Sequence, residues 1–384
     1  MNAARFISRR LRFEGKIAVV STAISFFVMI LAVAISSGFR HELRGGITAV
    51  SGDIQLTAPD LNYLSENDPV SLRQPWSDWI GQMEGVRKIT PAVYRAGIVR
   101  SGDNIHGVLF KGVPDGPDSL GVRIPSRLAK MLGLEKGDRL PAYFVGERVK
   151  VRNFRVDDIY PAILSGDENL VVFAGLPDMQ RLNGWEEDEV SAIELELSDK
   201  RNTALTAMTG HIGTMILLMT PEDEDTVLAT SALDKYPQIF SWLDLIDLNV
   251  VIILVLMTIV AGFNMISGLL ILLFRNISTI GTLKSLGMTD RSISEVFLRV
   301  ASDIVLKGML AGNAAALLFC AVQGATHLLK LNPENYFVSF VPVRVNLVTV
   351  AAADIAAYVV IMLLLLIPGL FVSRVDPART VRVR

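Results

Sequence analysis

Four long runs of apolar residues, none of which contains a charged side chain, constrain this chain more than any other feature. The runs are Ile17–Ile35, Leu248–Phe274, Gly308–Thr326 and Ile355–Ser373. A helix rises about 1.5 Å per residue, so each run can cross a hydrocarbon core of about 30 Å. Hydrophobic residues make up 51% of the chain and are concentrated in these runs. The sequence therefore predicts a membrane protein with four transmembrane helices.

The basic residues predict how these helices are oriented. They gather before the first run, between the second and third runs, and after the fourth. In chain order they are Arg5, Arg9, Arg10, Arg12, Lys16, Arg275, Lys284, Arg291, Arg299, Arg374, Arg379, Arg382 and Arg384. Because cytoplasmic loops are enriched in Lys and Arg, we expect a multi-pass protein of a bacterial inner membrane with both termini in the cytoplasm.

The start of the chain allows a second interpretation. Basic residues precede the first run, and Ala32–Ala34 resembles a cleavage site, so the run could be a signal peptide. Its length and the helical pattern that continues through Gly38–Arg44 favour a membrane helix. Apolar residues interleaved with arginines within residues 6–13 predict an amphipathic helix that lies in the plane of the membrane before it.

The segment between the first two runs has the size of a whole domain, roughly 200 residues. Polar residues alternate with β-branched or aliphatic ones in Asp53–Thr57, Val149–Arg152 and Ile193–Leu197, which is the period of half-buried strands. Ser126–Leu134 carries apolar residues at helical spacing and is followed by a turn signal at Lys136–Asp138. These patterns predict a mixed α+β fold.

The expected organisation follows from these segments. Residues 1–44 should hold the amphipathic helix and the first transmembrane helix, and residues 45–240 a large periplasmic α+β domain. Residues 241–384 should hold the other three transmembrane helices and a short cytoplasmic helix.

Residue types that carry chemistry form no recognisable motif. The chain lacks the G-x-x-x-x-G-K-[ST] phosphate loop that ATP hydrolysis would need. Its four histidines are scattered, and its single cysteine, Cys320, lies in an apolar run, so neither a zinc site nor a disulfide is expected. The net charge of −2 hides an uneven distribution, since basic residues cluster beside the apolar runs and acidic residues fill the long middle segment, so nucleic acid is not expected as a partner. We expect no enzymatic activity and no directly bound cofactor, with ATP acting only through a partner subunit.

The loop between the second and third runs is patterned as two helices. Ile280, Leu283 and Leu286 recur at helical spacing, and Gly287 follows as a helix stop. Thr289 is typical of the N-cap of a second helix. The first helix could lie among lipid headgroups, or it could be a coupling helix that fits a groove on an ATPase.

Small and polar residues in the membrane runs indicate close helix packing. Gly308–Gly312 is a small-xxx-small pattern, which suits packing within the chain or a dimer face. Asn264, Ser267, Asn313 and Gln323 lie at membrane depth, where polar side chains either join helices or line a cavity.

Seven motifs together resemble a known family. In chain order they are Ser37–Leu43, Gly52–Leu56, Tyr236–Leu243, Phe263–Leu269, Ile280–Met288, Asn332–Val338 and Val341–Val343. The chain resembles the FtsX-like and MacB-like permeases of ATP-binding-cassette (ABC) systems over nearly its whole length. The last two motifs resemble a signature of the lipoprotein-releasing, LolC/LolE-type branch. The coupling helix departs from the family because Ser278 or Thr279 stands where a glutamate is common.

The resemblance implies a permease subunit that extracts lipoproteins from the inner membrane and passes them to a periplasmic carrier. Its expected partners are a cytoplasmic ABC ATPase dimer, a second permease copy or paralogue, the lipoprotein cargo, the carrier and membrane lipids. The implied ATPase contact lies within about residues 276–288, and the implied residues are Ile280, Gly281, Leu283, Lys284, Leu286, Gly287 and Met288. A membrane cavity for acyl chains is implied near Phe26, Met29, Asn264 and Met265.

Two other functions are compatible with the same family. One is a MacB-like permease that transmits mechanical work to an efflux duct, and the other is an FtsX-like regulator of a cell-wall hydrolase. Depletion would then cause drug sensitivity or filamentation, respectively, instead of loss of outer-membrane lipoproteins.

Overall fold

The computed structural model describes residues 16–64, 69–102, 104–146, 148–160, 170–221, 226–332 and 336–369. The chain forms two compact units. The globular unit consists of the described parts of Glu42–Ser241 and Leu331–Ser339, and the helical unit of those of Met1–His41, Trp242–Lys330 and Phe340–Arg384. The predicted amphipathic helix and the basic C-terminal residues lie outside the described residues.

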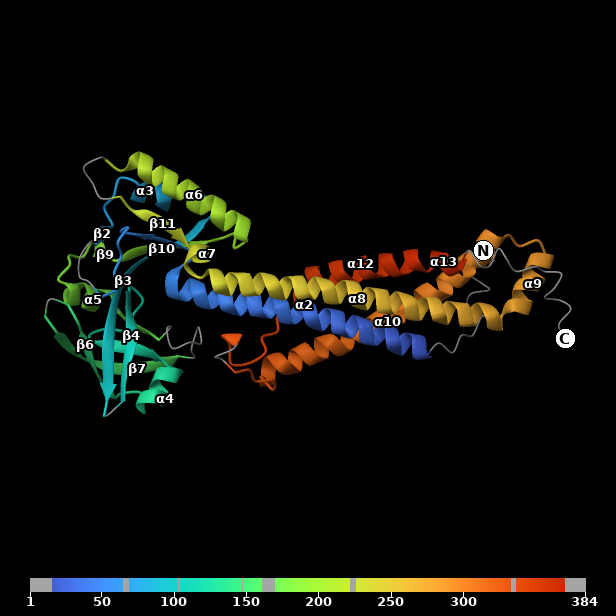
Figure 1. Cartoon of the computed structure of the whole chain (residues 1–384), viewed down its shortest axis with the longest axis horizontal. Coiled ribbons are helices and arrows are strands. Elements are labelled where there is room, and N and C mark those ends of the chain that lie inside the picture. The colour runs from blue at the N-terminus through green and yellow to red at the C-terminus, as the bar shows by residue number, and fades with distance from the viewer. Residues whose placement is uncertain are drawn as a thin grey trace. The chain divides into compact units, whose positions relative to one another are not determined.

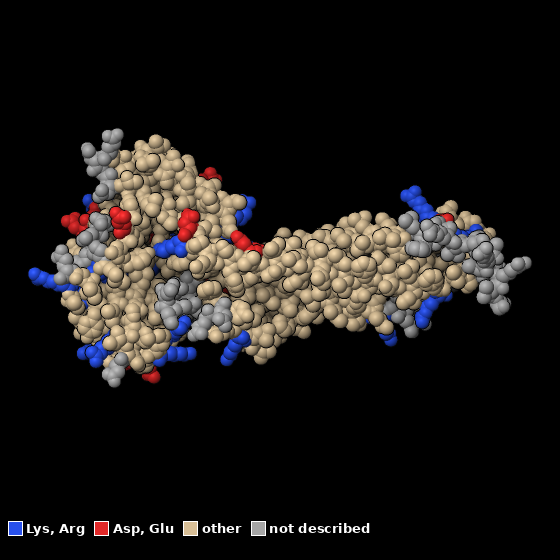
Figure 2. All heavy atoms as spheres, viewed as in Figure 1, with Lys and Arg blue, Asp and Glu red and all other residues tan. Residues whose placement is uncertain are grey.

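Four helical stretches are long and apolar enough to cross a membrane. They are α2 (Lys16–Ser51), α8 (Pro237–Arg275), α10 (Asp290–Thr326) and Leu347–Pro368, which comprises α12 (Leu347–Leu364) and most of α13 (Leu366–Gly369). Each contains one of the predicted apolar runs as far as the structure describes it. Figure 2 shows that charged side chains are sparse along these helices and gather toward their ends.

Two predicted boundaries in the helical unit are wrong. The last helix begins at Leu347, well before Ile355, because Asp354 interrupts the uncharged run but not the helix. The short helix predicted after Thr289 and the third run form one continuous helix, α10. Thr289 is its N-cap, as predicted, and its side chain accepts a hydrogen bond from the Ser292 N–H.

The helix α2 continues through the Gly38–Arg44 segment to Ser51, as the sequence predicted. It runs antiparallel to α8, since contacts pair Ser21 with Asn264, Met29 with Thr258 and Ser36 with Asp247. Figure 1 shows the two helices side by side. Farther along the same pair, the rings of Phe39 and Trp242 meet edge to face with centroids 5.5 Å apart.

The globular unit is a mixed α+β structure, as predicted. Its strands are β1 (Ile54–Thr57), β2 (Val70–Ser71), β3 (Val86–Ser101), β4 (Asn104–Val113), β5 (Gly121–Pro125), β6 (Arg139–Phe144), β7 (Lys150–Tyr160), β8 (Val171–Gly175), β9 (Glu189–Val190), β10 (Ala192–Leu197) and β11 (Leu228–Ser231). Its shorter helices are α3 (Ser77–Gly81), α4 (Ser126–Leu132), α5 (Leu176–Asn183), α6 (Asn202–Met219) and α7 (Ala232–Lys235).

Nine of these strands form one sheet, in the order β11-β1-β10-β3-β4-β8-β5-β7-β6. The strand β3 also pairs with β6, through Ile98 with Tyr143 and Val99 with Ala142. The six strands from β3 to β6 in this order therefore close into a ring, and β10, β1 and β11 extend the sheet from the first half of β3. The rings of Phe110, Phe144 and Phe154 pack together in its core.

The predicted strands and helix of this unit are confirmed at the level of secondary structure. Asp53–Thr57 contains β1, Val149–Arg152 lies at the start of β7, and Ile193–Leu197 lies in β10. The helix predicted from Ser126 is α4, which ends at Gly133 in the left-handed conformation. Glycine adopts this conformation without a steric penalty, which explains its place as the stop.

Candidate functional sites

The segment between α8 and α10 contains a short helix and a tight turn. The helix α9 (Ile277–Ser285) ends where Gly287 adopts a left-handed φ of 86°. The Gly287 N–H donates to the Lys284 carbonyl at 2.9 Å, and the Met288 N–H donates to the Leu283 carbonyl at 3.0 Å. This pair of bonds is the Schellman motif, which requires a residue in the left-handed region and therefore favours glycine. The predicted stop at Gly287 is confirmed.

Most of the residues implied in ATPase coupling point inward. Ile280 is only 1% exposed and packs in the core of the helical unit, and Gly281 is also buried. Leu283 and Met288 are half-buried against the same core. These four residues hold α9 in place, so their implied contact with a partner is not supported by their exposure.

The charged and exposed members of this set have different surroundings. The Lys284 ammonium lies 2.7 Å from a carboxylate oxygen of Asp290 in the first turn of α10, which ties the two helices together. Leu286 is 79% exposed at the turn. The exposed side of α9 also carries Ile277, which is 37% exposed, and the hydroxyl groups of Ser278 and Thr279.

The residues implied in a membrane cavity lie in or beside the packed interior. Phe26, Met29 and Met265 are buried in one apolar cluster of the helical unit. A hollow beside Met265 and Ala18 has no room for a water molecule. Asn264 is half-buried, and its amide donates to the Ser21 hydroxyl on α2. In the isolated chain these residues join α2 to α8 and do not line an open cavity.

The glycines of α10 permit close packing within the chain. A Cβ added to Gly308 would lie 2.7 Å from the Thr22 Cβ, and one added to Gly312 would lie 2.4 Å from the Ala23 carbonyl oxygen. Both neighbours are on α2. The small-xxx-small pattern therefore serves packing between α10 and α2 in this chain.

Two motifs that carry the family resemblance contact one another in the helical unit. A Cβ added to Gly38 would lie 2.3 Å from the Pro342 carbonyl oxygen, so this position has no space for a side chain. Next to it, the Arg344 N–H donates to the Ala34 carbonyl at 3.0 Å.

Gln323, another polar residue predicted at membrane depth, holds the loop between α10 and α12, since its amide bonds the backbone of Leu329.

A buried polar cluster in the globular unit surrounds the end of α2. Lys111 on β4, whose side chain is 2% exposed, donates to a Glu194 carboxylate oxygen on β10 at 2.8 Å. The same ammonium donates to the carbonyls of Val50 at 2.8 Å and Ala49 at 3.1 Å. Carbonyls at a helix end lack partners within the helix, and a cation there also favours the helix dipole. Tyr94 completes the cluster, because its hydroxyl bonds Glu194 and the Val50 carbonyl.

Burial shifts the pKa of two members of this cluster, Lys111 and Tyr94. Desolvation lowers the pKa of Lys111, although the Glu194 carboxylate acts in the opposite direction. Desolvation also raises the pKa of Tyr94 well above its ordinary value, and Glu194 adds to this effect. The alternation in Ile193–Leu197 predicted a half-buried strand, but Glu194 is itself buried, because the end of α2 covers that face.

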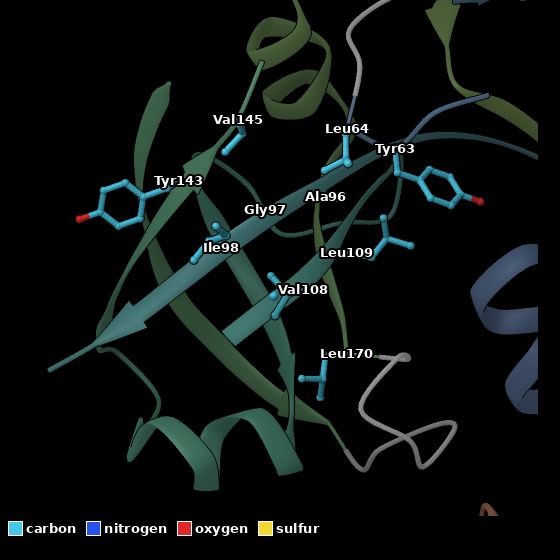
Figure 3. A pocket seen from close by; sticks show the side chains of 11 residues that line it. Tyr63, Leu64, Ala96, Gly97, Ile98, Val108, Leu109, Tyr143, Val145 and Leu170 are labelled. Carbon is cyan, nitrogen blue, oxygen red and sulfur yellow. The ribbon is translucent and has the colours of Figure 1, made fainter. Parts of the chain in front are cut away.

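A largely apolar groove of about 440 Å³ lies on the outer side of the strand ring. Figure 3 shows β3 and β4 as its floor, with Ile98 and Leu109 among the lining side chains. A Cβ added to Gly107 on β4 would meet no atom within 4 Å, so this glycine leaves the groove wider than another residue would. No sequence pattern predicted this groove, because its residues come from distant segments.

Asp354 is the residue that the sequence reasoning missed in the helical unit. It lies in α12, is 8% exposed and accepts a hydrogen bond of 2.6 Å from the Asn313 amide on α10. Asn313 was among the polar residues predicted at membrane depth, and the structure assigns it to a contact between helices. A charged residue type inside an apolar helix was the available signal.

Comparison with known proteins identifies relatives that cover most of the chain. Residues 251–377 match the family model described as FtsX-like permease C-terminal. The lipoprotein-releasing system transmembrane protein LolC of Neisseria meningitidis is 21% identical over 96% of this chain and 94% of that protein. The LolE protein of Haemophilus influenzae is 22% identical over 95% of this chain and 93% of that protein.

Among solved structures, the periplasmic region of MacB from Actinobacillus actinomycetemcomitans is similar with a TM-score of 0.31 and 12% identity, over 50% of this chain and 95% of that one. The sequence comparisons confirm the resemblance stated above. Residues 251–377 thus match the FtsX-like permease C-terminal model, and along most of its length the chain is similar to the LolC and LolE lipoprotein-releasing transmembrane proteins.

Proposed function

We propose that this chain is the permease subunit of an ABC complex that extracts lipoproteins from the bacterial inner membrane and passes them to a periplasmic carrier. The observation that carries the proposal is the similarity to LolC and LolE over 95–96% of the chain, which includes both the globular and the helical unit. In this arrangement the chain does not hydrolyse ATP, and a separate cytoplasmic ATPase dimer supplies the work.

The arrangement in the membrane follows from the same proposal. The four long apolar helices cross the bilayer, both termini and α9 lie in the cytoplasm, and the globular unit lies in the periplasm. Since α2 and α8 bond one another along the helical unit, a displacement of either helix near α9 would also move the other. The residues implied in a membrane cavity are packed within the single chain, so a cavity for acyl chains would have to form between this chain and a second permease copy or a paralogue.

Contact with the ATPase is proposed at the turn that follows α9. Leu286 is the apolar side chain that the turn leaves exposed, and burying it in a groove would stabilise a complex by roughly 1.5–3 kcal/mol. The hydroxyl-bearing side of α9 would contribute hydrogen bonds. If α9 instead lay among lipid headgroups, binding of the ATPase should not depend on Leu286.

The coupling test uses Leu286→Asp in the complex that the chain forms in its own cell. An aspartate buried without a partner costs several kcal/mol, so we expect the ATPase to be lost from pull-downs of the variant. Leu218→Asp is the matched control, because Leu218 on α6 is 73% exposed and lies in the globular unit. Full recovery of the ATPase with Leu286→Asp would reject the docking role of the turn.

The cargo is tested separately by depletion of the chain. We expect outer-membrane lipoproteins to accumulate in the inner membrane, because their extraction would stop. Normal lipoprotein sorting after depletion would reject lipoprotein release, even if the chain still bound an ATPase.

A further inference from the structure

Asp354 occupies a position where an ionised side chain is costly. It lies in the middle of α12, which is otherwise apolar on the side packed within the helical unit, where Val350, Ala357 and Ile361 are buried. The side chain itself is 8% exposed. Charged residues at such depth in a membrane are rare and normally pair with a counter-charge or carry a function.

The partner of Asp354 is neutral. The Asn313 Nδ2 on α10 donates to Asp354 Oδ2 at 2.6 Å. Within the part of the chain that the structure describes, no Lys, Arg or His lies at ion-pair distance from this carboxyl group. The other carboxyl oxygen of Asp354, Oδ1, and the amide oxygen of Asn313, Oδ1, are buried and have no hydrogen-bond partner among these residues.

While Asp354 is ionised, both of these oxygen atoms are hydrogen-bond acceptors and cannot bond one another. One proton on Asp354 would supply the missing donor. A carboxylic acid has one O–H donor, and an amide oxygen accepts it. We propose that Asp354 carries a proton on Oδ1 and donates it to Asn313 Oδ1, so that the two side chains form a reciprocal pair of hydrogen bonds that holds α12 against α10. The proton removes the buried charge and satisfies both unpaired oxygens.

The surroundings favour a proton over a metal cation. Two oxygens are too few for Ca²⁺, which takes about 6–8 oxygen ligands, and the described residues contain no cluster of acidic, His or Cys side chains that would add ligands. Beside the pair, Ile30 of α2, Ala316 of α10 and Val350 of α12 form an apolar cluster.

Two other titratable side chains on the same helices have partners of their own. Tyr358 bonds the Ser302 hydroxyl at 2.7 Å, and Asp303 bonds Lys307 at 2.5 Å. The facing residues of α2, Phe27 and Ile30, carry no charge. The proton on Asp354 therefore depends on its contact with Asn313 and on the apolar surroundings.

The test compares the full-length wild-type chain in detergent with Asp354→Asn by infrared difference spectroscopy at neutral pH. We expect the wild type to show the carbonyl stretch of a protonated carboxylic acid that the variant lacks. Asp303→Asn is the control, because Asp303 is exposed and ion-paired, and its difference spectrum should contain carboxylate bands instead. Absence of the acid band in the wild type would overturn the proposal.

Thermal stability provides the second measurement. Asp354→Asn should have the same melting temperature as the wild type. An asparagine amide can donate to Asn313 Oδ1 and accept from Asn313 Nδ2, as the protonated acid does. Asp354→Leu and Asn313→Leu should melt at lower temperature, because each leaves a buried polar group without a partner. If Asp354→Asn were as unstable as Asp354→Leu, the carboxylate charge would be required and the neutral pair would be rejected. The outcome does not depend on which cargo the permease carries.

Discussion

The buried pair of Lys111 and Glu194 allows the polar cluster at the end of α2 to be tested by one substitution. Glu194→Gln keeps the size of the side chain and removes its charge. Lys111 would then remain buried beside two backbone carbonyls, without a counter-charge. Removal of one partner from a buried ion pair destabilises a protein by about 3–5 kcal/mol. This is a large part of the usual 5–15 kcal/mol of total stability.

The expected loss can be followed by tryptophan fluorescence of the full chain in detergent during heating. Trp76, Trp79 and Trp185 lie in the globular unit, and Trp76 is buried in its core. For a unit of this size, about 1 kcal/mol changes the midpoint by roughly 2–4 °C, so Glu194→Gln should lower it by roughly 6–20 °C.

A matched control lies two residues away on the same strand. Glu196, whose side chain is 27% exposed, pairs with Arg87 at 3.4 Å and with Lys200 at 3.3 Å. Pairs of this kind contribute about 1 kcal/mol or less, so Glu196→Gln should change the midpoint little. The double variant Lys111→Met/Glu194→Gln should recover part of the loss, because no charge remains buried. Equal midpoints for Glu194→Gln and Glu196→Gln would refute the reasoning.

Two further predictions concern pH and topology. Burial raises the pKa of Tyr94 and Tyr236, so above about pH 10 the unfolded chain releases protons that the folded chain keeps, and the contribution of these tyrosines to stability should fall as pH rises. The lowered pKa of Lys111 acts in the opposite direction, but only up to about its ordinary value. Tyrosinate absorbance should then rise together with the loss of folded tryptophan emission, and ionisation of all tyrosines in a still folded chain would contradict this. In a Cys320→Ser background, cysteines introduced at Asp60 and Lys284 should be labelled only from outside and only from inside the membrane, respectively. Outside labelling at Lys284 would overturn the proposed topology.

The features that the sequence predicted well are set by local signals. An uncharged run longer than a membrane core identifies a helix by length alone, and all four runs lie within long helices as far as they are described. Gly287 and Thr289 were recognised as a stop and an N-cap because their backbone roles depend on residue type more than on distant contacts.

The features that the sequence reasoning missed depend on which distant segments cover a residue. Alternation in Ile193–Leu197 predicted a half-buried strand, but the end of α2 and Lys111 cover the side that carries Glu194. Because the last apolar run was defined by the absence of charge, it began after Asp354. In the structure Asp354 lies within the helix and bonds a neutral side chain, Asn313, on another helix. Helical spacing placed Ile280, Leu283 and Leu286 on one face but could not say that the core would bury Ile280.

This last difference changes what a coupling contact can consist of. A helix that lay with its apolar face in a groove of an ATPase would expose that face before assembly, whereas α9 uses Ile280 and Leu283 to pack within its own chain. Lys284 is similarly engaged with Asp290. A partner that presses on the exposed Leu286 would therefore act on a turn that is bonded to the start of α10, and α10 is packed against α2 through Gly308 and Gly312. In the proposed complex, the turn and not the length of α9 would pass force from the ATPase to the membrane helices.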